Sequence, residues 1–447
     1  MLTLGLAASF RKRGLTVQPF KKGPDYIDPL WHSAAAGRVC RNLDFYTMPE
    51  AEIVQLFLRG AKGADINLIE GNKGLHDGVA LDGSNATAAL AKLLKTPVVL
   101  VIDTRGMTRG IAPLLLGYKA FDAEVKIAGV ILNQVGGPRH ESKLRAAIEN
   151  YTDIPVLGGV QRHTEMAVAE RHLGLVPANE AAHSISVIDA AARRIAAEVD
   201  LDRLIAIAEA APDLKIEPST PLPVKTADLR IGIARDSAFG FYYADDLEAL
   251  AETGIELVPF DTLADPHLPS GLDGIFIGGG FPETHMEALA ANNSLKADIR
   301  QAIDQGMPVY AECGGLMYLS RGILWNGKRA PMVGALPCDT VMHERPQGKG
   351  YVRLYETGEG PWPGCCGPIV GHEFHHSSIE NIDPGVKFAY RVERGHGIDG
   401  KHDGLVWKNV VAGYVHLRAV GGNTWPQRFA TFVRACRKGA SGLPSNQ

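Results

Sequence analysis

The fold of the second half of the chain is decided by the stretch Pro308-Val309-Tyr310-Ala311-Glu312-Cys313-Gly314-Gly315-Leu316-Met317-Tyr318. A short apolar strand runs into a turn of small residues, and a helical pattern follows directly. A cysteine at this junction lies at a helix N-terminus, where the dipole and the free N–H groups favour a thiolate. The alternative is a buried structural cysteine, the common fate of a free thiol. The strand–turn–helix setting favours a nucleophile at Cys313.

Two other segments carry residue types that such a nucleophile needs. The run 275–277 is apolar and ends in Gly278, Gly279 and Gly280. A glycine run of this kind can supply an N–H group to an oxyanion, as can the turn at Gly314; a plain tight turn is the alternative. The run 411–415 is strand-like and ends at His416, which suits a general base for the cysteine. A lone histidine is more often structural, so the assignment of His416 as a base rests on the support of the other two segments.

The 447 residues are too many for one core and predict two α/β domains. Continuous apolar runs predict parallel strands covered on both faces, and helical patterns alternate with them, which is typical of doubly wound sheets. A proline-rich stretch after residue 211 predicts a linker. We therefore expect a first domain at 1–195, a linker at 196–227 and a second domain at 228–447. The predicted strands are 16–20, 66–70, 98–103, 128–133, 229–234, 256–260, 274–277 and 308–311; the predicted crossover helices are 86–94 and 139–150.

Composition excludes several classes of protein. The net charge is −4, so nothing indicates a general attraction to nucleic acid or to an anionic membrane. No run is long and apolar enough to span a bilayer, and the N-terminus lacks the charge order of a signal peptide. The six cysteines form no CxxC pair, so reduced thiols in a cytoplasmic protein are expected.

These C-terminal motifs resemble the amidotransferase domain of the cobyrinic acid a,c-diamide synthase and cobyric acid synthase group. The resemblance rests on the segments around Cys313, Gly280 and His416. It implies a class I glutamine amidotransferase-like fold with Cys313 and His416 as catalytic residues and L-glutamine as ammonia donor. Many class I amidotransferases carry a glutamate two residues after the histidine, where this chain has Arg418. The group that orients His416 therefore stays open.

The N-terminal half carries the same family's loops. Lys21-Lys22-Gly23-Pro24-Asp25-Tyr26-Ile27-Asp28-Pro29 and Glu70-Gly71-Asn72-Lys73-Gly74-Leu75-His76-Asp77-Gly78 each follow a predicted strand. Taken without the family, each is a polar turn. The resemblance implies a P-loop, dethiobiotin-synthetase-like ligase domain that uses ATP and Mg²⁺. It assigns Asp25, Tyr26, Asp28 and Asp77 to the substrate, Lys21, Asp103 and Asn133 to ATP, and Glu70 and Asp28 to the metal.

One family part has no counterpart in the sequence. No GxxxxGK[ST] motif occurs, and Met1 to Leu6 resemble the helix that follows that loop. We expect that a strand and a phosphate loop of roughly 15–20 residues are missing, through a start codon placed too late.

The resemblance covers residues 1–435 and implies ATP- and glutamine-dependent amidation of the a and c acetates of cobyrinate or hydrogenobyrinate, through an acyl phosphate. Amidation of another tetrapyrrole such as sirohaem is an alternative, because Asn72 and Lys73 replace apolar residues. A P-loop regulatory ATPase and an ATPase-dead pseudoenzyme are further alternatives, and a homodimer is left open. The histidine cluster 371–377 does not match a zinc motif, and hydrogen-bonded histidines are favoured there over a metal.

Overall fold

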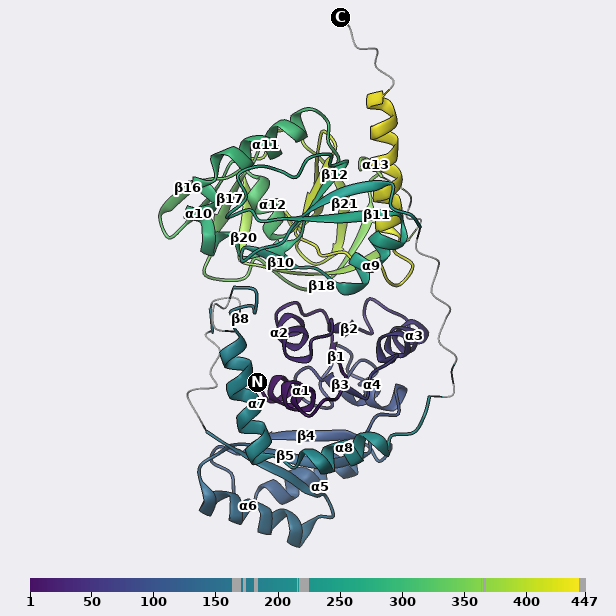
Figure 1. Cartoon of the computed structure of the whole chain (residues 1–447), viewed down its shortest axis with the longest axis vertical. Helices are drawn as coiled ribbons and strands as arrows, with labels where there is room; N and C mark the ends of the chain where they lie inside the picture. Colours follow the sequence, from purple (N-terminus) through teal and green to yellow (C-terminus); the bar gives the residue numbers. More distant parts are fainter. Residues whose placement is uncertain are drawn as a thin grey trace, which may run out of the picture. The chain divides into compact units, whose positions relative to one another are not determined.

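The structure is a computed structural model, and it describes residues 1–162, 170–171, 174–180, 184–214, 216, 225–362, 364 and 367–441. The chain divides into two compact units, Met1–Glu170 with Leu175–Thr220 and Arg171–Gly174 with Pro221–Gln447 (Figure 1). Each unit is an α/β structure, as predicted. Among the described residues, no helix combines the length and the hydropathy needed to cross a membrane.

The first unit alternates helices and parallel strands, and the predicted elements are found to within a few residues. Its helices are α1 (Leu2–Lys12), α2 (Ile27–Ala36), α3 (Glu50–Ala61), α4 (Thr87–Leu93), α5 (Ile111–Phe121), α6 (Pro138–Tyr151), α7 (Ser184–Glu198) and α8 (Leu201–Glu209). Its strands are β1 (Val17–Lys22), β2 (Arg41–Leu43), β3 (Ile66–Glu70), β4 (Val98–Asp103), β5 (Ile127–Val135) and β6 (Val156–Gln161). Two short strands, β7 (Glu170–Arg171) and β8 (Gly174–Leu175), pair with each other.

The strands of this unit form two sheets within the described chain, one in the order β2-β1-β3 and one in the order β4-β5-β6. All pairs are parallel. The two sheets share one core: α1 packs closely on α7, and their apolar faces contact Val17 of β1 and Ile131 of β5. The alternation of parallel strands and helices is the one that the sequence predicted, and β3 and β4 are each the edge of a separate sheet.

Ordered structure of the first unit continues past residue 195, where the sequence placed the end of the first domain. Helix α8 lies within the predicted linker range of 196–227. Its side chains Leu201 and Leu204 are buried in the same core as α1 and α7, which ties the helix to the first unit.

The second unit is built on a mixed sheet of nine described strands in the order β11-β9-β12-β14-β23-β22-β21-β18-β19. The strands are β9 (Leu229–Ala234), β11 (Ile255–Phe260), β12 (Gly274–Ile277), β14 (Val309–Glu312), β18 (Gly348–Glu356), β19 (Ile369–His375), β21 (Lys387–Arg394), β22 (His402–Trp407) and β23 (Val410–Gly413). The first five in spatial order are parallel, and the rest are antiparallel. The large sheet therefore continues from the doubly wound part into a strand-rich part.

Smaller elements surround this sheet. Strand β10 (Phe239–Phe241) pairs with β13 (Gly279–Gly280), and β16 (Lys328–Pro331), β15 (Gly322–Trp325), β17 (Asp339–Met342) and β20 (Ser377–Glu380) form a second sheet in that order. The helices are α9 (Ala244–Glu252), η2 (Pro282–His285), α10 (Met286–Ala291), α11 (Asn293–Asp304), α12 (Gly314–Leu319) and α13 (Trp425–Ser441).

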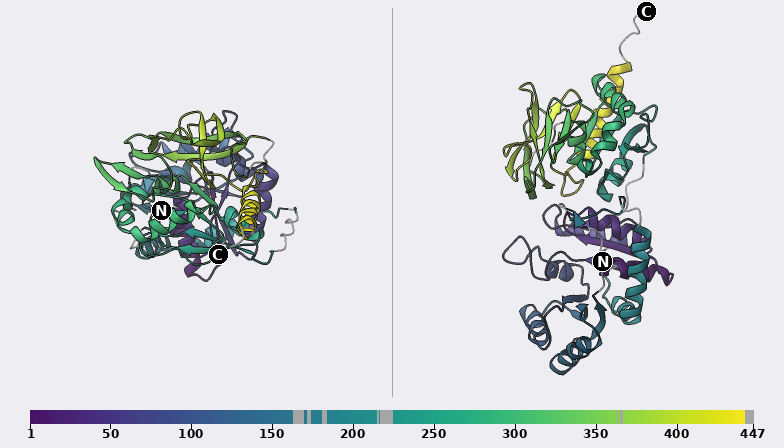
Figure 2. Two further views of the ribbon diagram at one scale, coloured as in Figure 1. Left: turned by 90° about the horizontal axis from the view of Figure 1, so that it is seen from above. Right: turned by 90° about the vertical axis from the view of Figure 1, so that its left-hand side faces the viewer.

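Helices cover both faces of the parallel part of the large sheet. Figure 2 shows α13, in yellow, running along the sheet, and it packs beside α9. Alternation along β14 sends Val309 and Ala311 into the core under α11 and α12, and Tyr310 into the core under α9 and α13. Because β14 lies between β12 and β23, the segments that follow these three strands meet at one edge of the sheet.

Candidate active site

Cys313 lies on a sharp turn between β14 and α12. Its backbone angles are φ 48° and ψ −103°, so a non-glycine residue is held in a left-handed conformation. Its N–H donates to the carbonyl of Gly413, 2.7 Å away, which anchors the turn to β23. The thiol is 7 % exposed, and its Sγ lies 4.0 Å from the carbonyl oxygen of Phe374. The predicted strand–turn–helix junction is therefore present, with a geometry that suits a nucleophile elbow.

His416 lies three residues after the end of β23 and contacts the sulfur. The imidazole is hydrogen-bonded to Cys313, so the structure brings the two predicted catalytic side chains together. Two backbone hydrogen bonds hold the residue in place: its N–H donates to the carbonyl of His372 (2.8 Å), and its carbonyl accepts from the N–H of His372 (3.3 Å). Its Nδ1 lies 3.2 Å from Oε2 of Glu312.

The surroundings of His416 favour the protonated ring. Burial lowers the pKa of His416, but the hydrogen bonds to Cys313 and Glu312 and the negative charges of both groups outweigh burial and raise the pKa to about 10. The neighbouring His372 behaves in the opposite way: burial and the positive charge of His416 lower the pKa of His372 to about 3. One imidazole of the pair is therefore charged and the other neutral near pH 7.

The predicted oxyanion glycines lie where neighbouring backbone segments and the His416 ring approach one another closely. A Cβ atom added to Gly314 would lie 3.0 Å from the backbone N of Gly280, and one added to Gly279 would lie 2.6 Å from Cε1 of His416. A Cβ atom at Gly280 would meet the carbonyl oxygen of Ala238 at 1.9 Å. Glycine is needed at these positions because the two backbone segments and the imidazole approach one another too closely for side chains.

Arg418, at the position where many class I amidotransferases carry a glutamate, does not share the surroundings of His416. Its guanidinium is 1 % exposed, forms an ion pair with Asp245 of α9, and stacks over the ring of Tyr243 with Cζ 4.5 Å from the centroid. The next residue, Ala419, donates its N–H to Asp246 at 2.5 Å. The first turn of α9 therefore holds the chain that follows His416.

In the first unit, a buried ion-pair cluster gathers at the carboxyl ends of β1 and β3. Nζ of Lys21 lies 2.5 Å from Oδ2 of Asp28, 2.5 Å from Oε1 of Glu70 and 3.8 Å from Oδ2 of Asp25. The other carboxylate oxygen of Glu70 lies 2.9 Å from Nε2 of His32. Tyr26 directly precedes α2. Four of the predicted site residues thus share one cluster, centred on the Lys21 ammonium.

Charge pairing dominates the protonation states of this cluster. Burial lowers the pKa of Lys21, but the charges of Glu70, Asp28 and Asp25 outweigh burial and raise it. Burial raises the pKa of Glu70, but the hydrogen bond from His32 and the positive charge of Lys21 outweigh burial and lower it. Burial and the Asp28 carboxylate raise the pKa of Asp25 to about 6.

The arrangement does not form a magnesium site by itself. Glu70 and Asp28, the predicted metal ligands, both face the Lys21 ammonium, and the second oxygen of Glu70 faces His32. In the part of the chain that the structure describes, no group of three or more potential ligand side chains is placed to hold an ion. At a nucleotide site Mg²⁺ takes one or two carboxylates together with phosphate oxygens and waters, so Glu70 and Asp28 would have to exchange their contacts with Lys21 to hold it.

The remaining predicted residues of the first unit lie outside this cluster. Asp77 is exposed, and its carboxylate accepts the N–H of Gly74 (3.2 Å) within its own loop. Asp103 and Asn133 are register partners on β4 and β5, in the other three-stranded sheet. Asp103 pairs with Arg105 at 2.5 Å on the surface.

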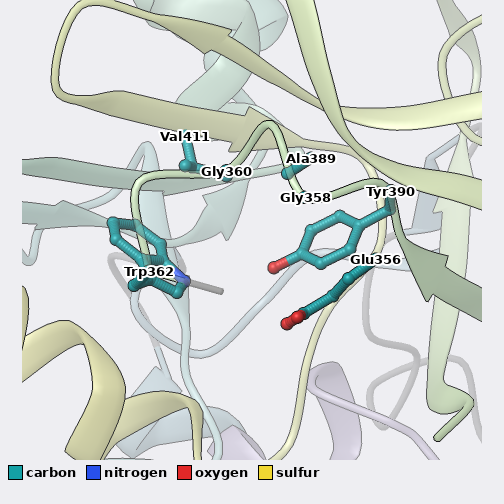
Figure 3. Close-up of a pocket in the computed structure, with 7 residues that line it drawn as sticks. All are labelled: Glu356, Gly358, Gly360, Trp362, Ala389, Tyr390 and Val411. Atoms are coloured by element: carbon teal, nitrogen blue, oxygen red, sulfur yellow. The ribbon is translucent and has the colours of Figure 1, made fainter. Parts of the chain in front are cut away.

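Two further features of the second unit carry polar groups or space. In the histidine cluster, Nδ1 of His375 lies 2.8 Å from the carbonyl oxygen of Ser377, and the His375 ring stacks on Tyr414 with centroids 3.6 Å apart. A pocket of about 10 Å³ lies nearby. Figure 3 shows two of its lining side chains, Glu356 and Tyr390, side by side across from Trp362. A cavity of this volume holds about one water molecule, so it is no substrate site.

Two contacts at these sites were not predicted from the sequence. Glu312 stands in the quoted stretch, but strand alternation alone would send it away from the side chain of Cys313. His32 lies in an unremarkable helical pattern, and only the fold brings it to Glu70. A signal existed for Glu312, since a carboxylate at the end of an otherwise apolar strand needs a buried partner.

Comparison with known proteins agrees with both units. The family model of the CobB/CobQ-like glutamine amidotransferase domain matches residues 230–424, and that of an AAA domain matches residues 47–170. The chain is 48 % identical to the cobyrinate a,c-diamide synthase of Magnetococcus marinus, over 97 % of this chain and 94 % of that protein. Identity to the proteins of the same name from Methanosarcina acetivorans and Archaeoglobus fulgidus is 42 % and 40 %, over 94 % and 96 % of this chain and 89 % and 93 % of theirs. The chain therefore belongs to the cobyrinate a,c-diamide synthase family.

Proposed function

We propose that the protein is a carbon–nitrogen ligase that amidates the a and c acetate carboxylates of cobyrinate in cobalamin biosynthesis, with ATP and glutamine. The observation that carries this proposal is the 48 % identity to a cobyrinate a,c-diamide synthase along 97 % of the chain. The contact between Cys313 and His416 supports the same reaction, because glutamine must be hydrolysed to supply ammonia.

The second unit is proposed to release ammonia. The sulfur of Cys313 attacks the side-chain carbonyl carbon of glutamine, and the C–N bond breaks. His416, protonated at rest, gives its proton to the leaving nitrogen. Water then hydrolyses the thioester, which yields glutamate and the free thiol. The N–H groups of the glycine turns, with Gly279, Gly280 and Gly314 as the proposed contributors, stabilise the oxyanion.

The first unit is proposed to activate the carboxylate. ATP supplies the phosphoryl group, because a carboxylate is a poor electrophile, and ammonia displaces phosphate from the resulting acyl phosphate. No step is derived through Mg²⁺, which stays a prediction. The proposed ligase region is 1–195 and the proposed amidotransferase region is 228–447. We assign Lys21, Asp103 and Asn133 to ATP, and Asp25, Tyr26, Asp28 and Asp77 to the macrocycle or its acyl group.

Product analysis tests this proposal. Purified protein is incubated with ATP, Mg²⁺, glutamine and one macrocycle at a time, and carboxamide formation is followed by mass spectrometry. The expected result is conversion of two carboxylates of cobyrinate, and no conversion of sirohaem. Amidation of sirohaem alone would contradict the assignment. Light scattering tests whether the protein forms a homodimer. The homodimer, a cytoplasmic location and the lack of a nucleic-acid partner stay predictions.

A further inference from the structure

The glutaminase site contains a buried carboxylate to which no role has been given. Glu312 is 3 % exposed and ends β14, directly before Cys313. Its Oε2 lies 3.2 Å from Nδ1 of His416. Its Oε1 accepts hydrogen bonds from the Tyr310 hydroxyl (2.6 Å) and from the N–H of Leu417 (3.0 Å). Both oxygens are therefore held in place, one by the ring and one by two donors.

The backbone explains how two consecutive residues reach the same imidazole. In a regular strand, Glu312 and Cys313 would point to opposite faces of the sheet. Glu312 follows this alternation, since it shares the face of Tyr310. Cys313 has a φ of 48°, so the chain turns there and the sulfur comes back towards the ring. Because Nδ1 faces Glu312, the other ring nitrogen, Nε2, is left for the sulfur.

The other charged groups that flank this segment of the described chain hold partners of their own. Arg418, two residues after the histidine, carries the opposite charge and is neutralised by Asp245. Asp246 accepts the N–H of Ala419. Asp403 accepts the N–H groups of Tyr414 (3.0 Å) and Val415 (3.1 Å), so it holds the backbone before His416.

We propose that Glu312 is the positioning residue of the glutaminase site: its carboxylate accepts the Nδ1 proton of His416, fixes the ring so that Nε2 faces Cys313, and stabilises the imidazolium. The inference rests on the proposed glutaminase function and adds the group that orients the base. The same logic operates in hydrolase triads, where a carboxylate holds the histidine without touching the substrate.

The test compares two replacements of Glu312. Glu312→Gln keeps the shape and can still accept from Nδ1, but it removes the charge. We expect the glutamine-dependent kcat to fall about 100-fold, with the KM for glutamine changed less than about threefold. The alkaline limb of the glutaminase pH profile should move to lower pH, because the imidazolium loses a stabilising charge. Glu312→Asp keeps a negative charge near the ring, so its alkaline limb should shift to lower pH by less than that of Glu312→Gln.

Asp403→Asn is the matched control. It removes the charge of a buried carboxyl group that binds the backbone before His416, and burial raises the pKa of that group to about 7. The alkaline limb of the pH profile, which lies above this value, should therefore stay that of the native protein. Urea titration checks the fold of every variant. If Glu312→Gln fails this check, Glu312→Asp decides, because its shorter side chain should shift the alkaline limb part of the way: a partial shift with a lowered kcat supports the proposal, and a native kcat with a native profile refutes it. A Glu312→Gln protein with native kcat and pH profile, or one that behaves like Asp403→Asn, overturns it. If the native protein itself shows no glutaminase activity, the proposed function has failed instead.

Discussion

In the second unit, the strands that lead to Cys313 and His416 are hydrogen-bonded neighbours, whereas in the first unit the proposed ligand residues lie on two separate sheets. Because β14 and β23 run parallel in register, the residues after the end of one strand must meet the residues after the end of the other. No such register ties Lys21 and Glu70 to Asp103 and Asn133. A continuous sheet thus brings together motifs that are far apart in the sequence. Where the strands are divided between two sheets, only motifs that follow strands of the same sheet come together.

If the two units act independently, one substitution should separate their activities. Cys313→Ser replaces the nucleophile and leaves the first unit untouched. We expect the glutamine-dependent rate to fall at least about 1,000-fold, because a serine at this position lacks a thiolate. Amidation with added ammonium salt should stay near the native rate. Both rates are measured by product formation; loss of both would show that the two sites are not separable.

The next largest effect is expected in the ion-pair cluster of the first unit. Lys21→Met leaves Glu70 and Asp28 facing each other without their cation. We expect a loss of about 3 kcal/mol in the free energy of unfolding, measured by urea titration, because a buried pair is broken on one side. ATP-dependent amidation should be lost, and hydrolysis of glutamine at Cys313 should persist. If Lys21→Met has the native free energy of unfolding, the ion pairs of Lys21 do not stabilise the fold.

The pH dependence of the second unit gives a smaller effect. His416 has a pKa of about 10 in the folded chain, against 6.5 for an ordinary histidine. A raised histidine pKa contributes stability that is fully present below pH 6.5 and is lost as the pH rises towards 10. Urea titrations should therefore show the free energy of unfolding falling as the pH rises from 6.5 towards 10. His416→Asn should lack this fall, and an identical slope in that variant would contradict the assignment.

The smallest effect is expected at the surface of the second sheet of the first unit. The Asp103 and Arg105 side chains are 45 % and 63 % exposed, and exposed pairs stabilise proteins little. Asp103→Ala should change the free energy of unfolding by less than about 1 kcal/mol. The KM for ATP should rise in the same variant if Asp103 contacts the nucleotide, as proposed. An unchanged KM would remove Asp103 from the site.

The sequence predicted the second unit better than the first, for physical reasons. The apolar runs before Cys313 and before His416 could each be recognised as strands. Because parallel strands all end at the same edge of a sheet, the residues that follow them are expected to lie close together. The separation of β3 from β4 could not be predicted, because each strand has the same apolar pattern whether or not it has two neighbours. Glu312 and Cys313 both reach His416 because the backbone of Cys313 has a positive φ. Cysteine has no preference for such a conformation, so the sequence does not predict it.

The turn at Cys313 also bears on how the site withstands motion. The acceptor of the Nδ1 proton and the sulfur belong to consecutive residues, whose Cα atoms are fixed about 3.8 Å apart by covalent bonds. A displacement of the end of β14 therefore moves both residues in the same direction. The two contacts of the His416 ring are thus tied to one short stretch of backbone, so they shift together when that stretch shifts.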